Sequence, residues 1–152
     1  MRLVVFLHGS RYDRLYQAVN LIVTAAAMGW KCHLFLFFGA LASFMSGSWD
    51  DVNVSAAGEG DRPDVKRSGP SAEDPCGAEE LQRGFERANI PSLYGLLEKA
   101  RRESGGVTVC ACSTSVRLLN LDPASVKARV DEIVGLSTML QIASEAEHAI
   151  YI

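Results

Sequence analysis

Residues 107–119 read VTVCACSTSVRLL and follow a Gly-Gly pair at positions 105 and 106. The first six residues form a largely apolar, β-branched run, which is typical of a strand that is covered on both faces of a parallel sheet. The hydroxyl residues Ser113, Thr114 and Ser115 follow at once and suit the start of a helix. This junction predicts a strand that passes directly into a helix, the unit from which α/β folds are built.

Similar runs recur on both sides of this junction. Residues 3–7 and 32–38 predict two strands before it, and residues 130–134 and 148–152 predict two after it. Helices are expected between the strands, over residues 11–28, from 39, over 92–103, over 113–119, from 122 and over 136–146. The alternation predicts one α/β domain with a five-stranded parallel sheet in a three-layer α/β/α arrangement. The strand order stays open, with 2-1-3-4-5 as one arrangement among several.

Local signals give the expected helix ends. Ser10 is expected to cap the helix over residues 11–28. Gly29 and Gly105 are expected to end the helices that precede them, because glycine readily adopts the left-handed conformation of a helix end. Asp122 precedes Pro123, a pair typical of a helix cap and first turn.

Residues 47–80 have a different composition from the rest of the chain. They hold three of the five prolines and half of the eighteen acidic residues, with almost no apolar periodicity. We expect a polar, flexible insertion in the single domain 1–152, either solvated or laid over one end of the sheet. Residues 81–88 that follow predict a short helix.

Composition excludes several classes of partner. Of the 152 residues, 48% are hydrophobic and 22% charged, and the formal net charge is −3. A chain without a basic surplus is not expected to bind nucleic acid. The longest uninterrupted apolar stretch, residues 34–45, is shorter than the roughly 18 residues of a membrane-spanning helix, so no stable membrane insertion is expected.

The cysteines indicate the compartment. We expect no export signal in the first residues, because the apolar run of residues 3–7 is too short for one and lacks a small-residue cleavage site. The four cysteines, at positions 32, 76, 110 and 112, include no C-x-x-C pair, which argues against a zinc ribbon or a thioredoxin-type dithiol. The expectation is a cytoplasmic protein with reduced thiols. The three dispersed histidines predict no metal site.

In parallel α/β sheets the chemistry lies beyond the carboxyl ends of the strands. This rule brings a set of small, hydroxyl, thiol and imidazole residues to one edge. They are His8, Gly9, Ser10, Gly39, Cys112, Ser113, Thr114, Ser115 and Gly135.

Cys112 is the strongest candidate for a reactive group at this edge. A thiol at the start of a helix meets unpaired backbone N–H groups, which favour the thiolate, and Arg117 would act in the same direction if it lies close. The alternative is that Cys112 is a small apolar filler at a strand end, because free cysteines are commonly buried.

Three other residues admit a functional or a structural interpretation. Cys110 shares a strand face with Cys112 but is more typical of core, as is Cys32 inside its apolar run. Cys76, in the insertion, is either a second thiol that relays sulfur or an incidental surface cysteine. His8 is either a proton shuttle beside the thiolate or a residue that only lines the edge.

Several motifs are absent. Cys112 and Arg117 enclose four residues and Cys110 and Arg117 enclose six, whereas cysteine phosphatases and arsenate reductases need five. The loop after residues 3–7 is too poor in Ser, Thr and Gly for a flavodoxin-like FMN site. No G-x-G-x-x-G or Walker loop is present. No cofactor is therefore expected.

These segments together resemble the DsrE/DsrF-like (DsrEFH-like) family of small sulfur-relay proteins, which includes members labelled peroxiredoxin-like. The resemblance covers most of the chain outside the insertion. It rests on the order and spacing of residues 3–7, 12–18, 24–29, 35–39, 91–93, 109–113, 134–138 and 150–152.

The resemblance implies a five-stranded parallel sheet, a homo-oligomer, and a cysteine after the third strand that carries sulfane sulfur as a persulfide or thiosulfonate. That cysteine corresponds to Cys112. The long insertion and the extra thiol of Cys110 depart from the family pattern. The leading hypothesis is a sulfur carrier or sulfurtransferase with donor or acceptor proteins as partners. The alternative is a non-catalytic oligomeric interaction module, or a small-molecule-binding regulatory module, of the same fold.

Overall fold

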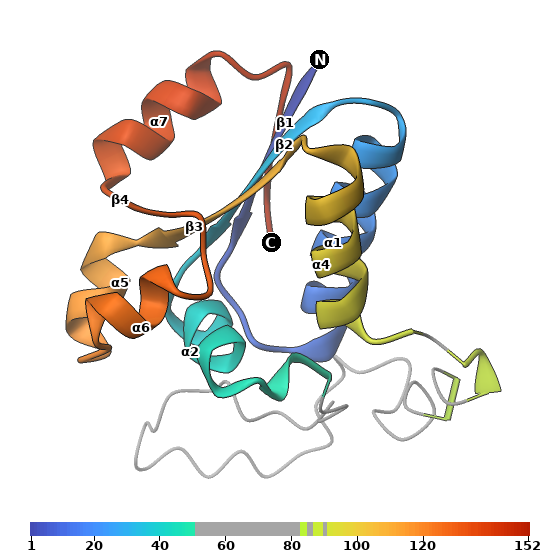
Figure 1. Ribbon diagram of the computed structural model, residues 1–152, viewed down its shortest axis with the longest axis horizontal. Coiled ribbons are helices and arrows are strands. Elements are labelled where there is room, and N and C mark those ends of the chain that lie inside the picture. Colours follow the sequence, from blue (N-terminus) through green and yellow to red (C-terminus); the bar gives the residue numbers. More distant parts are fainter. Residues whose placement is uncertain (51–82, 85–86, 90) are drawn as a thin grey trace, which may run out of the picture.

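The computed structural model describes residues 1–50, 83–84, 87–89 and 91–152 (Figure 1). Residues 51–80 of the predicted insertion, with Cys76, lie outside the described residues. Of the short helix predicted over 81–88, residues 83, 84, 87 and 88 are described, and the first three of them are helical. The elements follow the chain in this order: β1 (Arg2–Leu7), α1 (Tyr12–Ala27), β2 (Lys31–Leu36), α2 (Phe38–Ser46), η1 (Ser48–Asp50), α4 (Leu93–Ser104), β3 (Val107–Cys112), α5 (Ser113–Leu118), α6 (Pro123–Lys127), β4 (Glu132–Val134), α7 (Leu136–Ser144) and β5 (His148–Tyr151).

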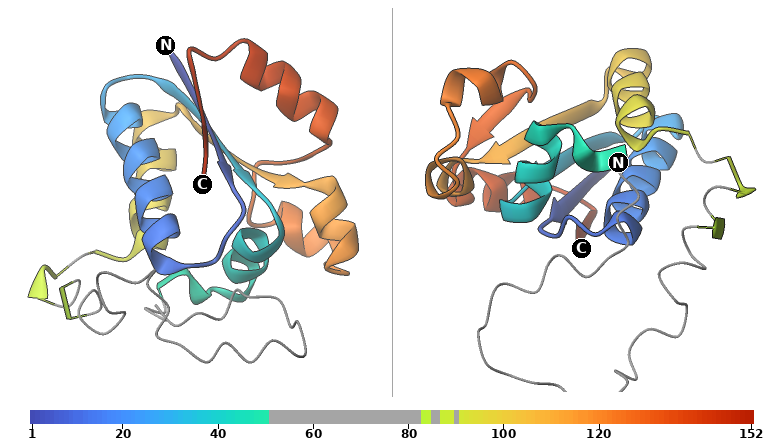
Figure 2. Two further views of the ribbon diagram at one scale, coloured as in Figure 1. Left: turned by 180° about the vertical axis from the view of Figure 1, so that it is seen from behind. Right: turned by 90° about the horizontal axis from the view of Figure 1, so that it is seen from below.

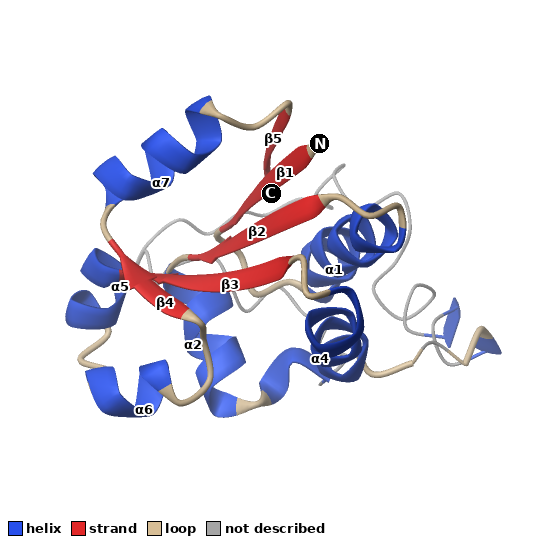
Figure 3. Ribbon diagram, turned by 45° about the horizontal axis from the view of Figure 1, so that its top comes forward, coloured by secondary structure: helices blue, strands red, loops and turns tan. Residues whose placement is uncertain are grey.

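The five strands form one parallel sheet in the order β4-β3-β2-β1-β5 (Figure 3). The first four strands are neighbours in sequence order, and the chain then returns across the sheet so that β5 pairs with β1. Right-handed crossovers that advance in one direction place their helices on one face, and the returning crossover places its helix on the other. The predicted three-layer α/β/α fold is therefore confirmed, and the strand order is not 2-1-3-4-5.

The helical layers differ in depth. Helices α1 and α4 lie side by side on one face, while α7 crosses the opposite face (Figures 1 and 2). We call the first the thick face, because the larger core cluster fills it with side chains from α1, α2, α4 and three strands. We call the second the thin face. Its buried cluster is Val4, Phe6, Phe35, Phe37, Cys110, Cys112, Val134 and Met139.

Most expected helix ends agree with the structure. Gly105 directly follows α4 with φ of +59°, and Gly29 follows Met28, the C-cap residue of α1, with φ of +80°, so a left-handed residue ends each helix. Asp122 caps α6, and its carboxylate accepts a hydrogen bond from the Ser125 N–H at 2.9 Å. The Val107–Cys112 strand has the predicted bounds.

The predicted cap of the first helix is wrong. Arg11, not Ser10, occupies the cap position of α1, and no side chain caps the helix. The helix begins one residue later than expected, at Tyr12, so Ser10 lies too far back to reach its first N–H groups. Instead the Arg11 guanidinium pairs with Asp13 in the first turn, with an N–O distance of 3.1 Å.

The first described residues of the predicted polar insertion, residues 48–50, are packed against the domain. Trp49 is 1% exposed, and its Nε1–H donates to the Ala40 carbonyl at 3.2 Å. Asp50 accepts hydrogen bonds from the Ser92 hydroxyl at 2.7 Å and from the Leu93 N–H at 2.5 Å. Element η1 therefore belongs to the thick face and anchors the start of α4. Within the described parts of the chain, no helix is long and apolar enough to cross a bilayer.

Candidate functional site

The carboxyl ends of β1, β2, β3 and β4 meet at one edge of the sheet. Backbone hydrogen bonds tie the segments that follow them: the Ala40 N–H donates to the His8 carbonyl at 3.1 Å, and the Phe37 N–H donates to Leu7 at 3.0 Å. The Phe38 N–H donates to the Ser115 hydroxyl at 3.2 Å, which links α2 to α5. The structure therefore brings together the residues that follow β1, β2 and β3.

Cys112 is the last residue of β3 and the cap residue of α5. It is 5% exposed and belongs to the buried cluster of the thin face. Cys112 pairs in register with Val134 of β4. Phe37 and His8 each follow the last paired residue of β2 and β1, so they continue the same row of residues across the sheet. The thiol is thus placed at the expected edge, in apolar surroundings.

The imidazole of His8 stacks on the Phe37 ring, with centroids 4.4 Å apart and an interplanar angle of 2°. Partial burial lowers the pKa of His8, which favours the neutral ring. Because Phe37 occupies the row position between His8 and Cys112, an aromatic ring separates the imidazole from the thiol. This arrangement favours the structural interpretation of His8 over that of a direct proton shuttle.

The hydroxyl residues after Cys112 divide into two kinds. Ser113 and Thr114 are exposed at the start of α5, as is Arg117 in its last turn. Ser115 is fully buried, and its Oγ accepts the Phe38 N–H. Two of the three hydroxyls are therefore open to a ligand, and the third holds the edge together.

The three predicted glycines, Gly9, Gly39 and Gly135, have different surroundings at this edge. A side chain at Gly39 would place its Cβ 3.4 Å from the His8 carbonyl oxygen and 3.5 Å from the Ser10 hydroxyl, which are ordinary van der Waals distances, so the position does not require glycine. Gly9 lies against the Arg14 side chain, and Gly135 is the cap residue of α7 near the Ser113 hydroxyl. Ser10 is exposed.

Cys110 and Cys32 lie on opposite faces of the sheet. Both are fully buried, and burial raises the pKa of Cys110 to about 12 and that of Cys32 to about 11. Cys110 shares the thin face with Cys112, as the spacing predicts. Cys32 is in the thick-face core, where its thiol donates to the Ile22 carbonyl at 3.8 Å.

Sequence reasoning missed two aromatic residues and a methionine at this edge. Phe38 has φ of +32°, an uncommon value for a residue with a side chain, and it is 45% exposed. Phe37 and Met139 are buried beside Cys112 in the thin-face cluster. The Phe37-Phe38-Gly39 run was the available signal, since two aromatics before a glycine stand at the strand end.

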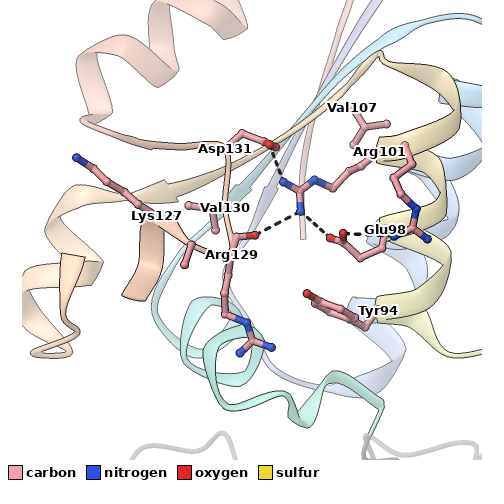
Figure 4. A pocket seen from close by; sticks show the side chains of 10 residues that line it. Tyr94, Glu98, Arg101, Val107, Lys127, Arg129, Val130 and Asp131 are labelled. Atoms are coloured by element: carbon pink, nitrogen blue, oxygen red, sulfur yellow. Dashed lines mark hydrogen bonds and ion pairs between the residues drawn. The ribbon is translucent and has the colours of Figure 1, made fainter. Parts of the chain in front are cut away.

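A separate cavity of about 480 Å³ lies away from this edge, between α4 and the segment that leads into β4 (Figure 4). The Arg101 guanidinium pairs there with Glu98 and Asp131, both at 2.6 Å. The other oxygen of Asp131 accepts the Val109 N–H at 2.7 Å. The side chains of Lys127 and Arg129 extend away from Arg101 (Figure 4). The charge of Arg101 is thus neutralised by Glu98 and Asp131 within the network, which joins α4 to the sheet.

Among residues 1–50, 83–84, 87–89 and 91–152, no three His, Cys, Asp or Glu side chains are grouped to bind a metal. The carboxyl edge therefore offers a thiol, exposed hydroxyls and aromatic rings. Nucleophilic chemistry at sulfur is what these groups can perform.

Comparison with known proteins gives the family. A search of curated proteins finds no match. The model of the DsrE/DsrF/DrsH-like family matches residues 1–151. The chain therefore belongs to the DsrE/DsrF/DrsH-like family.

Proposed function

We propose that this protein is a cytoplasmic sulfur carrier or sulfurtransferase that holds sulfane sulfur on Cys112 and passes it to a partner protein. The observation that carries the proposal is the position of Cys112, where β3 passes into α5 at the carboxyl edge of a parallel sheet. Membership of the DsrE/DsrF/DrsH-like family suggests sulfur relay as the general role.

The chemistry consists of two exchange steps. The Cys112 thiolate attacks the sulfane sulfur of a donor, a new S–S bond forms, and the donor's leaving group departs with the electron pair of the bond that breaks. The product is a persulfide or thiosulfonate on Cys112. A thiolate of the acceptor protein then attacks the sulfane sulfur bonded to Cys112 Sγ, a new S–S bond forms to the acceptor, and Cys112 leaves as the thiolate, ready for another cycle.

Access to the thiol is part of the proposal. Cys112 is 5% exposed, whereas its neighbours Ser113 and Thr114 are exposed. The donor and acceptor proteins would dock over this edge and displace the first turn of α7, which follows the strand paired with Cys112. A homo-oligomer is part of the same proposal, with exposed apolar residues of the thin face, such as Leu140 and Tyr151, available for subunit contacts.

The test is mass spectrometry after incubation with polysulfide or with tetrathionate. We expect sulfur adducts on the peptide that contains Cys112, and none there in Cys112→Ser. Cys32→Ala is the matched control, because it removes a buried thiol from the opposite face and should keep the adduct. No adduct on the wild type, or the same adducts on Cys112→Ser, would contradict the proposal.

The burial of Cys112 favours a second candidate, a non-catalytic oligomeric interaction module. Alkylation of the folded protein at neutral pH, followed residue by residue, separates the two candidates. A sulfur carrier requires Cys112 to react much faster than Cys32. Equal protection of both thiols favours the interaction module, in which Cys112 only fills space.

A further inference from the structure

The thin face collects three sulfur-bearing side chains in one buried cluster. Cys110, Cys112 and Met139 all belong to it, with exposed fractions of 0%, 5% and 0%. They come from β3 and α7, two elements that the sheet order brings together through β4. We propose that this sulfur triad binds a soft monovalent metal ion, Cu(I). This inference goes beyond sulfur transfer and does not depend on it.

The two thiols are neighbours on one face of β3. They are two residues apart on β3, so their side chains leave the same face of the strand. Their Cα atoms are about 6.6 Å apart in extended backbone, the outer limit for a direct disulfide. An ion bound to both sulfurs tolerates a wider gap, because two metal–sulfur bonds of about 2.3 Å separate the sulfurs by up to about 4.6 Å.

Met139 comes to the same buried cluster from α7. Its N–H donates to the Gly135 carbonyl at 3.1 Å, so it lies in the first turns of α7. Gly135 directly follows Val134, the partner of Cys112 in the sheet register. Side chains in a helix tilt toward its N-terminus, which directs the thioether of Met139 toward the ends of β3 and β4.

The ligand chemistry selects the ion. Thiolate and thioether sulfur prefer soft ions, and Cu(I) is satisfied by two or three such ligands. A structural zinc site needs four, and the described residues contain no group of three His, Cys, Asp or Glu side chains to build one. Phe35 and Phe37 belong to the same cluster and exclude water from it. When the ion binds, Cys110 and Cys112 each release a proton to solvent, which leaves a Cu(I) dithiolate.

The experiment is an anaerobic titration with Cu(I) in competition with a chromophoric Cu(I) chelator. It uses the whole chain with Cys76→Ser, because that thiol lies outside the described residues and would bind copper independently. We expect one Cu(I) per chain, with binding lost in Cys110→Ala and in Cys112→Ala. Met139→Leu, which keeps the volume but removes the thioether, should weaken binding by about tenfold, the lower end of the cost of removing a group that supports a metal ion.

Cys32→Ala is the matched control, since it removes a buried thiol from the thick face and should leave the stoichiometry unchanged. Circular dichroism of each variant separates loss of the site from loss of the fold. If a variant does not fold, the number of sulfur ligands around copper in the Cu(I)-loaded Cys76→Ser chain, measured by X-ray absorption, provides the same test. An absence of binding, or binding that survives Cys110→Ala, overturns the inference.

Sulfur loading of the wild type is measured beside the copper titration. Loading without copper binding overturns the metal site and leaves the proposed function intact. Copper binding without sulfur loading contradicts the proposed function and leaves the metal site intact.

Discussion

The two faces of the sheet differ in how they are covered, and the candidate chemistry lies on the one with less cover. Helices α1, α2 and α4 and element η1 bury a large cluster on the thick face. The thin face is packed against α7, whose buried residue is Met139. Most of the buried apolar side chains that stabilise this fold therefore lie on one face of the sheet, and the candidate reactive sulfurs lie on the other.

The cysteines make the difference explicit. Cys32 is enclosed on the thick face, where its thiol donates a hydrogen bond to the Ile22 carbonyl. Cys112 lies on the thin face at the sheet edge, under the start of a short helix. Elements with few buried contacts open at lower free energy than the core, so access to Cys112 requires less unfolding than access to Cys32.

At the margin of the thin face, an aromatic pair is buried on one side and exposed to solvent on the other. The Tyr151 ring stacks on Phe6, with centroids 4.5 Å apart, yet Tyr151 is 66% exposed. Leu136 and Leu140 of α7 are also exposed. Exposed apolar side chains beside a candidate site are typical of surfaces that another protein covers.

The largest effect should come from the thick face. Trp49→Ala removes a buried indole, its hydrogen bond to Ala40 and its contact with Phe44, whose ring centroid lies 5.0 Å away. We expect a loss of about 3–5 kcal/mol in the free energy of unfolding, measured by urea denaturation. Trp49→Phe keeps a ring and should cost clearly less. A loss below about 1 kcal/mol in Trp49→Ala would mean that η1 is not part of the core.

A smaller and more local effect should follow a change on the thin face. Met139→Ala leaves a cavity between α7 and β3 and should cost about 2–3 kcal/mol, near the lower end for such a truncation. Hydrogen exchange should accelerate in α7 while the amides of α1 keep their protection. Met139→Leu nearly conserves volume and is expected to cost less than about 1.5 kcal/mol. Equal acceleration in both helices would show that the two faces open as one unit.

Much of the fold was predictable because its signals are local. The bounds of Val107–Cys112, the left-handed glycines at 29 and 105 and the Asp122 cap all depend on residues close in sequence. Strand order was not predictable, because alternating strands and helices are compatible with several orders. Trp49 was missed for a related reason: its burial depends on Ala40 and Phe44, and the acidic residues that follow dominate the local composition.

The sequence allowed the location of the candidate site to be predicted, but not the side chains that surround it. The edge rule brought His8, Gly39 and Ser115 to the same place, where hydrogen bonds connect their segments. The ring of Phe37 beside His8 and the cover of Met139 over β3 depend on side-chain packing between distant segments. Periodicity indicates which face a residue occupies but does not identify its neighbours there.

The smallest predicted effect is a pH dependence that also belongs to the thin face. His33 lies in β2, and its Nδ1 is buried without a hydrogen-bond partner in the described part of the chain. Burial lowers the pKa of His33, the positive charges of Arg2 and Lys31 lower it further, and Glu132 opposes them. The folded state therefore keeps the ring neutral at a pH where the unfolded chain already binds a proton. This contribution to stability is fully present above the unfolded value of 6.5 and is lost as the pH falls through the lower pKa of the folded state.

His33→Gln should flatten the decline in unfolding free energy as the pH falls below 6.5, as measured by urea denaturation at a series of pH values. His148→Gln is the control, because His148 lies exposed on the edge strand β5, where it stacks on Trp30 with centroids 5.4 Å apart. The control should follow the wild-type profile. If His33→Gln follows it as well, protonation of His33 costs no folding free energy, and the thin face is covered more loosely than the burial of Met139 implies.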